Sequence, residues 1–156
     1  HIADNVSLYD IEYVPNYGVV AALGGNDDAT QEPLEHAFVF NDYTLSLEAE
    51  LDVKSAPIAL TCNVTGESVF ISPMEADAVG TFIVEFRTDT HLQVNYYLTA
   101  GNLASNCLIL DSEGKFMYVA VDDHSDNNSF EPYNDNTYNI QRIEIVPWGT
   151  FPINEY

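Results

Sequence analysis

A period of two residues dominates the alternation of apolar and polar side chains along this chain. From Tyr43 to Val53 every second residue is apolar, and the residues between them are Thr, Ser, Glu or Asp. Successive side chains of a strand point to opposite faces, so this run predicts a strand with one buried face and one wet, acidic face. Further strands are predicted at 81–86, 91–99, 114–121 and 138–146, and weaker ones at 6–13, 17–23, 36–40, 58–62, 68–71 and 107–111.

The predicted strands are separated by turn residues. Asp89-Thr90 joins two strands, and Asp111 to Gly114 fits a type I turn closed by a left-handed glycine. In the run 91–99 the alternation places Leu92, Val94, Tyr96 and Leu98 on one face. We expect an all-β, antiparallel β-sandwich of about ten short strands, with jelly-roll and immunoglobulin-like topologies both open.

The domain organisation predicted from the sequence is simple. The 156 residues fit one domain, 1–156, in which 147–156 forms an extended C-terminal strap. We find no internal sequence repeat.

Charge narrows the classes of partner. The chain has 25 acidic and 4 basic side chains, which gives a formal net charge of −21. Nucleic-acid affinity depends on Lys and Arg displacing counterions, and anionic membranes also require basic residues. We therefore exclude nucleic acids as partners, and no apolar stretch is long enough for membrane insertion.

Two cysteines and three glycosylation sequons favour an extracellular location. We expect Cys62 and Cys107 to form a disulfide, which would close a loop of about 45 residues and stabilise the fold by about 4 kcal/mol. Two buried thiols are the alternative. The sequons begin at Asn5, Asn63 and Asn127. We expect a secreted glycoprotein.

One acidic loop is a candidate calcium site. Hard cations take six to eight oxygen ligands, and the loop after residue 121 offers many. The loop has neither the turn glycine nor the twelfth-position Glu of an EF-hand, and a solvated turn-forming loop is the simpler interpretation. The candidate ligands are Asp122, His124, Asp126, Asn128 and Glu131.

Two further sites are weaker alternatives. Exposed aromatic side chains can stack on sugars, and the candidate glycan contacts are Tyr133, Tyr138 and Trp148. His1 could bind copper through its amine and ring nitrogen, with another histidine completing the site. No catalytic motif stands out, so we do not expect an enzyme.

These observations lead to one functional expectation and two alternatives. We expect a non-catalytic extracellular surface or matrix protein that self-associates, for example by adding its N-terminal segment to the sheet edge of another subunit. The first alternative is a carbohydrate-binding module acting on extracellular glycans, with or without bound Ca²⁺. The second is a copper protein that uses His1.

Overall fold

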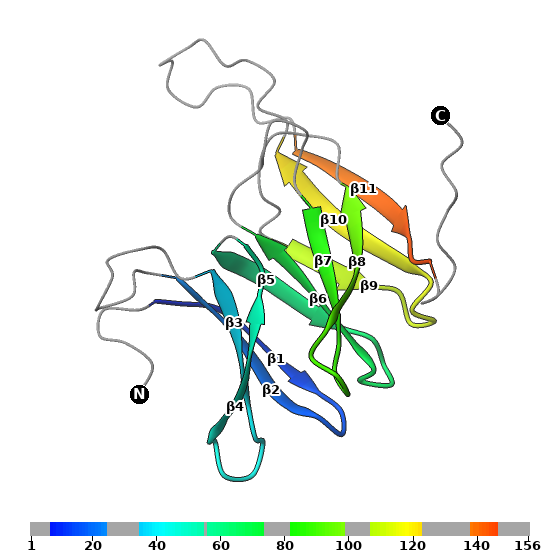
Figure 1. Ribbon diagram of the computed structural model, residues 1–156. Helices are drawn as coiled ribbons and strands as arrows, with labels where there is room; N and C mark the ends of the chain where they lie inside the picture. The colour runs from blue at the N-terminus through cyan, green and yellow to red at the C-terminus, as the bar shows by residue number, and fades with distance from the viewer. Residues whose placement is uncertain are drawn as a thin grey trace, which may run out of the picture.

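The structure, a computed structural model, describes residues 7–24, 35–54, 56–73, 82–98, 107–122 and 138–146 (Figure 1). Eleven strands form in these ranges, and none of the described residues belongs to a helix that could cross a lipid bilayer. The strands are β1 (Ser7–Val14), β2 (Gly18–Gly24), β3 (His36–Phe40), β4 (Leu47–Asp52), β5 (Pro57–Cys62), β6 (Ser68–Pro73), β7 (Phe82–Arg87), β8 (Gln93–Leu98), β9 (Cys107–Leu110), β10 (Phe116–Asp122) and β11 (Tyr138–Glu144).

The strands form three antiparallel sheets, and each sheet is a simple meander. Their orders are β1-β2-β3-β4, β5-β6-β7-β8 and β9-β10-β11, so every strand pairs with its neighbours in the chain. The sheets follow one another in space in the same order as in the sequence (Figure 1). The predicted all-β, antiparallel class with face-to-face sheet packing is confirmed, and the packing involves three sheets.

The three meanders repeat with a spacing that residue identities do not reveal. Their first strands begin at Ser7, Pro57 and Cys107, each fifty residues after the last. Their second strands begin at Gly18, Ser68 and Phe116. Equivalent positions carry different side chains, so the repeat is one of strand and turn spacing. Repeats of this length are typical of stacked sheet architectures such as propellers.

The middle sheet, β5–β8, is buried on both faces. One apolar cluster fills the space between it and β1–β4, and a second fills the space between it and β9–β11. All six residues of β6 are buried, which explains why Val69, Phe70 and Ile71 follow one another in it without alternating with polar residues. The first cluster includes Val14, Val20, Val39, Leu51, Leu60, Ile71 and Phe86, and the second includes Phe70, Ile83, Tyr97, Leu108, Met117 and Val119.

The sheets approach one another along their first strands. The backbone of β5 lies beside β1 and β2 on one side and beside β9 on the other. The carboxylate of Asp10 on β1 accepts a hydrogen bond of 2.8 Å from the backbone N–H of Leu60 on β5. The stack therefore has the form of a fan in which the first strands are close together (Figure 1).

The structure corrects two predicted strands. Residues 41–46 form a hairpin turn instead of strand: the Asn41 side-chain oxygen accepts hydrogen bonds from the backbone N–H groups of Tyr43 and Thr44, and Tyr43 is 93% exposed. On β8 the buried side chain is Tyr97, whereas Tyr96 is exposed, so the apolar alternation of 91–99 does not mark the buried face. The predicted turn at Asp111 is confirmed, since Gly114 has a φ of 67°.

Candidate functional site

Most of the predicted calcium loop lies outside the described residues. Asp122 is the last residue of β10, and His124, Asp126, Asn128 and Glu131 fall in the range 123–137, which the structure does not describe. Within the described ranges, no group of three or more His, Cys, Asp or Glu side chains is placed to hold a metal ion. The calcium site therefore remains a prediction.

The other predicted site residues are placed only in part. Tyr138 begins β11, and Asn63 lies in the turn between β5 and β6, as predicted. The Asn63 side-chain oxygen accepts a hydrogen bond of 3.1 Å from the backbone N–H of Ser68, which fixes this turn. The remaining predicted residues, His1, Asn5, Asn127, Tyr133 and Trp148, lie outside the described ranges.

The predicted disulfide between Cys62 and Cys107 is absent from the structure. Cys62 points from β5 toward β1, where its thiol contacts the Glu12 carboxylate at 3.7 Å and the Tyr13 carbonyl oxygen at 3.6 Å. Cys107 lies opposite Ala120 on the face of the third sheet that points away from the middle sheet. The two thiols therefore belong to different layers, and this prediction was wrong.

A small acidic cluster lies where the first two sheets meet. Burial raises the pKa of the Cys62 thiol to about 11, and the nearby Glu12 carboxylate adds to this shift. Burial also raises the pKa of Glu12, while the hydrogen bond from Cys62 opposes that change. A thiol with so high a pKa is a poor nucleophile at neutral pH. We therefore interpret the cluster as structural.

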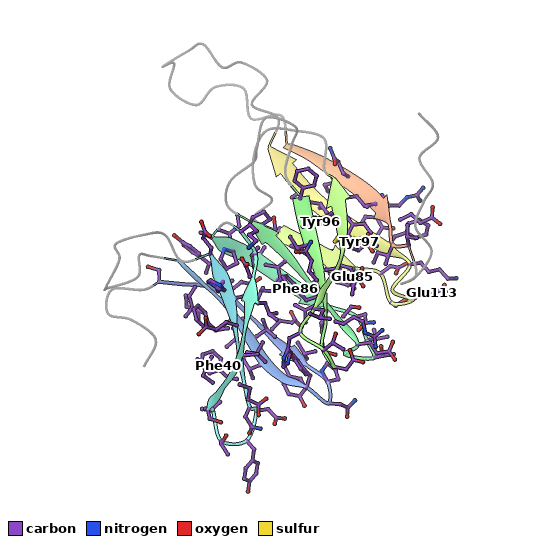
Figure 2. All side chains as sticks on the ribbon, viewed as in Figure 1. Phe40, Glu85, Phe86, Tyr96, Tyr97 and Glu113 are labelled. Carbon is purple, nitrogen blue, oxygen red and sulfur yellow. The ribbon has the colours of Figure 1, made fainter. Side chains whose placement is uncertain are left out.

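A buried polar network lies on the face of the middle sheet that packs against the third sheet. Glu85 is 5% exposed, and its two carboxylate oxygens accept hydrogen bonds of 2.7 Å from the hydroxyl groups of Ser68 and Tyr97. Asn95 donates a hydrogen bond of 3.1 Å to the Tyr97 oxygen. Figure 2 shows Glu85 and Tyr97 close together on neighbouring strands. Each carboxylate oxygen has a donor, so the network joins β6, β7 and β8 of the middle sheet.

The first sheet presents an apolar face to the outside. We call this face, which points away from the middle sheet, the first outer face. Strand pairing places Leu8, Ile11 and Tyr13 of β1 on it, and all three are exposed. The side chains of β2 and β3 on the same face form a third apolar cluster, in which Ala21, Leu23 and Phe38 are buried, and β4 contributes the exposed acid Glu50. The first outer face thus comprises Leu8, Ile11, Tyr13, Val19, Ala21, Leu23, His36, Phe38, Phe40, Leu47, Glu50 and Asp52.

The third sheet presents a mixed face at the other end of the stack. We call it the last outer face. The exposed apolar side chains on it are Ile109, Tyr118 and Ile140. Arg142, one of four basic residues in the chain, lies over the Phe116 ring with 4.8 Å between its guanidinium carbon and the ring centre. The last outer face comprises Cys107, Ile109, Phe116, Tyr118, Ala120, Ile140, Arg142 and Glu144.

These two outer faces are the best-supported candidate site, and the sequence analysis did not identify them. Exposed apolar side chains gathered on one sheet face are typical of interaction surfaces. The signal was present in β1, where apolar residues alternate with the acids Asp10 and Glu12. Those acids occupy the inner face, opposite Ala22 and Val20, so the polar and apolar faces are the reverse of the usual arrangement.

Comparison of the sequence with known families and curated proteins supplies no analogy for this chain. It matches no model of a known protein family, and no curated protein sequence matches it. The proposals below therefore depend on the residues and their geometry.

Proposed function

We propose that this chain is a non-catalytic extracellular protein that functions by associating with further copies of itself. The observation that supports this proposal is the exposure of Leu8, Ile11 and Tyr13 together on the first outer face. Transferring such side chains from water into an interface is favourable by about 25 cal/mol per Å² of apolar area. Both outer faces carry exposed apolar side chains, so each can contribute to an interface.

The net charge determines the conditions under which association is expected. At −21, two copies repel each other over distances comparable with the Debye length, which is about 8 Å at physiological ionic strength. Added salt screens this repulsion and does not weaken apolar contacts. We therefore expect self-association to strengthen as the salt concentration rises, unlike association driven by salt bridges.

The sequence suggested that the N-terminal segment adds to the sheet edge of another subunit. The structure pairs the described part of this segment within its own chain. That part, residues 7–14, is β1, which pairs along its length with β2 of the same chain. This pairing favours association through sheet faces over donation of the strand.

Light scattering tests the proposed function. We expect a solution mass above the chain mass of 17.4 kDa, increasing with protein concentration and with salt from about 0.01 M to about 0.5 M. Parallel samples with millimolar Ca²⁺ or a chelator test whether the acidic loop after Asp122 also contributes. A mass of 17.4 kDa at every concentration and salt level would contradict self-association.

We also propose that the protein is secreted and carries an N-linked glycan at Asn63. The turn position and the exposure of the adjacent Val64 support this, since glycans are added at accessible turns. Expression in a eukaryotic secretory host should give a protein whose mass falls on enzymatic deglycosylation. The Asn63→Gln variant should show a smaller mass loss. An unchanged mass loss in that variant would show that Asn63 is not modified.

A further inference from the structure

The strand registers define equivalent positions in the three sheets. In each sheet one row of three paired residues crosses the first, second and third strands on the face toward the preceding sheet. These rows are Ile11–Ala21–Phe38, Leu60–Ile71–Val84 and Leu108–Val119–Gln141. The second and third rows pack against the sheet before them. The first row has the same position in the first sheet and lies on the first outer face.

Exposure of the first-strand residue is what distinguishes the first row from the other two, since Ala21 and Phe38 of that row are 4% and 3% exposed. Leu60 and Leu108 are 4% and 7% exposed, whereas Ile11 at the equivalent position is 55% exposed. The side chain is equally apolar at all three positions. The first outer face therefore has the composition of an inter-sheet contact at a place where no sheet of the described chain covers β1.

The opposite faces of the sheets are related in the same way. The rows that face the following sheet are Glu12–Val20–Val39, Thr61–Phe70–Glu85 and Ile109–Tyr118–Arg142. The first two rows point into the inter-sheet layers, and the third lies on the last outer face. Each molecule already contains two contacts between sheets. Its two outer faces correspond to the two sides of one further contact of the same type.

We propose that a second copy of this chain docks its first outer face on the last outer face of the first copy. This inference rests on the proposed function, since it specifies the contact through which the copies associate. In the first internal contact, β5 packs against β1 and β2. By the same geometry, β1 of the second copy packs against β9 and β10. Ile11 and Tyr13 then meet the region of Ile109 and Tyr118, where exposed apolar side chains are available.

The two outer faces differ in charge. The last outer face carries Arg142 together with Glu144, whereas the first outer face carries Glu50 and Asp52 on β4. In a chain of net charge −21, a contact that brings one of four basic residues to an acidic strand reduces repulsion between the copies. A contact between two copies of the first outer face would instead bring two acidic strands together.

The contact joins two different surfaces, so it continues until the assembly closes or extends indefinitely. The fan narrows toward the first strands, which favours closure around them. Two copies supply six sheets, within the range of about four to eight sheets that form closed propellers. The smallest assembly that satisfies both outer faces of every copy is therefore a dimer with two equivalent head-to-tail contacts.

Complementation between face variants tests this proposal. Ile11→Asp places a charge on the first outer face, and Ile109→Asp places one on the last outer face. Each variant alone should be monomeric, because each loses both contacts of the ring. A mixture of the two retains one intact contact and should form a heterodimer that dissociates at least about tenfold more readily than the wild-type dimer. Tyr43→Asp, at the exposed β3–β4 hairpin, is the matched control and should dimerise normally.

The outcomes separate this inference from the proposed function. If wild-type protein associates but both face variants also associate normally, the head-to-tail contact is wrong and self-association stands. If one variant is monomeric and the mixture gives no heterodimer, the interface joins like faces and the inference is wrong. Charge exchange gives a second readout: Arg142→Glu should weaken dimerisation, and adding Glu50→Arg should restore it. Circular dichroism of each variant verifies that its sheets remain folded.

Discussion

The Tyr97 hydroxyl provides the sharpest test of how the buried polar network stabilises the middle sheet. It donates to the buried Glu85 carboxylate at 2.7 Å and accepts a hydrogen bond from Asn95 at 3.1 Å. The Tyr97→Phe variant keeps the ring, whose centre lies 5.9 Å from that of Phe70, and removes the hydroxyl. Glu85 then keeps one hydroxyl donor, Ser68, for two buried carboxylate oxygens.

The expected magnitude follows from the charge of the acceptor. A hydrogen bond to a charged group contributes about 1.5–3 kcal/mol, and leaving a buried acceptor without its donor costs that energy. We expect Tyr97→Phe to lower the free energy of unfolding by about 2 kcal/mol. In a chain of this length that corresponds to a fall in Tm of about 4–8 °C. Urea unfolding followed by circular dichroism measures the difference directly.

Tyr17 provides a matched control for the same chemical change. Its hydroxyl is buried, and in the described part of the structure it has no hydrogen-bond partner. Tyr17→Phe should leave the free energy of unfolding unchanged or raise it by up to about 1 kcal/mol, since it removes a buried polar group that lacks a partner. If Tyr97→Phe changes stability by less than about 0.5 kcal/mol, or if both variants lose equally, the network does not stabilise the middle sheet.

Three further predictions concern pH, thiol reactivity and turn geometry. The pKa of Tyr17 is raised from 10 to about 12, and that of Tyr97 is also raised, mainly by burial. The contribution of the two protonated hydroxyl groups to stability should be complete below pH 10 and lost as the pH rises toward 12. A free energy of unfolding that stays constant from pH 9 to 12 would contradict this. At pH 8, Cys62 in the folded protein should react with iodoacetamide about a hundredfold more slowly than Cys62 in the urea-unfolded protein. Mass spectrometry of the Cys107→Ser variant measures both rates, and equal rates would show that the thiol is not protected. Gly66→Ala should lower the free energy of unfolding by more than about 1 kcal/mol, because φ is +73° there and the new methyl group would overlap the Pro15 carbonyl oxygen in the β1–β2 turn. Calorimetry showing no loss would refute the strain.

The period-two alternation predicted most strands because burial of a sheet face acts on every second residue. The range 36–40 matches β3 at both ends, and 107–111 differs from β9 by one residue at its end. The alternation failed at residues 41–46 because a local interaction competed with it. The Asn41 side chain accepts two backbone hydrogen bonds and stabilises a turn, although Tyr43 and Leu45 continue the apolar pattern.

The buried face of β8 could not be derived from hydropathy alone. Tyr96 and Tyr97 are equivalent by composition, and the choice between them depends on Glu85, which lies on the adjacent strand. A partner for the Tyr97 hydroxyl exists only after β7 and β8 are paired. The two outer faces were missed for a related reason. Which side of β1 is covered depends on the middle sheet, and the sequence of β1 carries acids on the side that becomes covered.

One feature of the sequence indicates the layered arrangement. Residues 68–73 and 82–87 contain adjacent apolar residues instead of a strict alternation, which is typical of strands covered on both faces. Two such strands in succession indicate a middle layer and therefore at least three sheets. The predicted calcium, glycan and copper sites stay predictions, because nearly all of their residues lie outside the described ranges.

The head-to-tail contact is tested most directly by a designed cross-link. At the first internal contact, Cys62 on β5 touches Glu12 on β1, and the equivalent positions at the proposed contact are Tyr13 of one copy and Ile109 of the other. Tyr13→Cys and Ile109→Cys can be introduced together in a chain that also carries Cys62→Ser and Cys107→Ser.

Mild oxidation of this variant should give a disulfide-linked dimer on a non-reducing gel, at twice the 17.4 kDa chain mass, that disappears on reduction. The matched control replaces Tyr13→Cys with Tyr43→Cys, which lies at the exposed hairpin and should give no dimer. Equal cross-linking of both proteins, or none of the first, would contradict stacking of the outer faces.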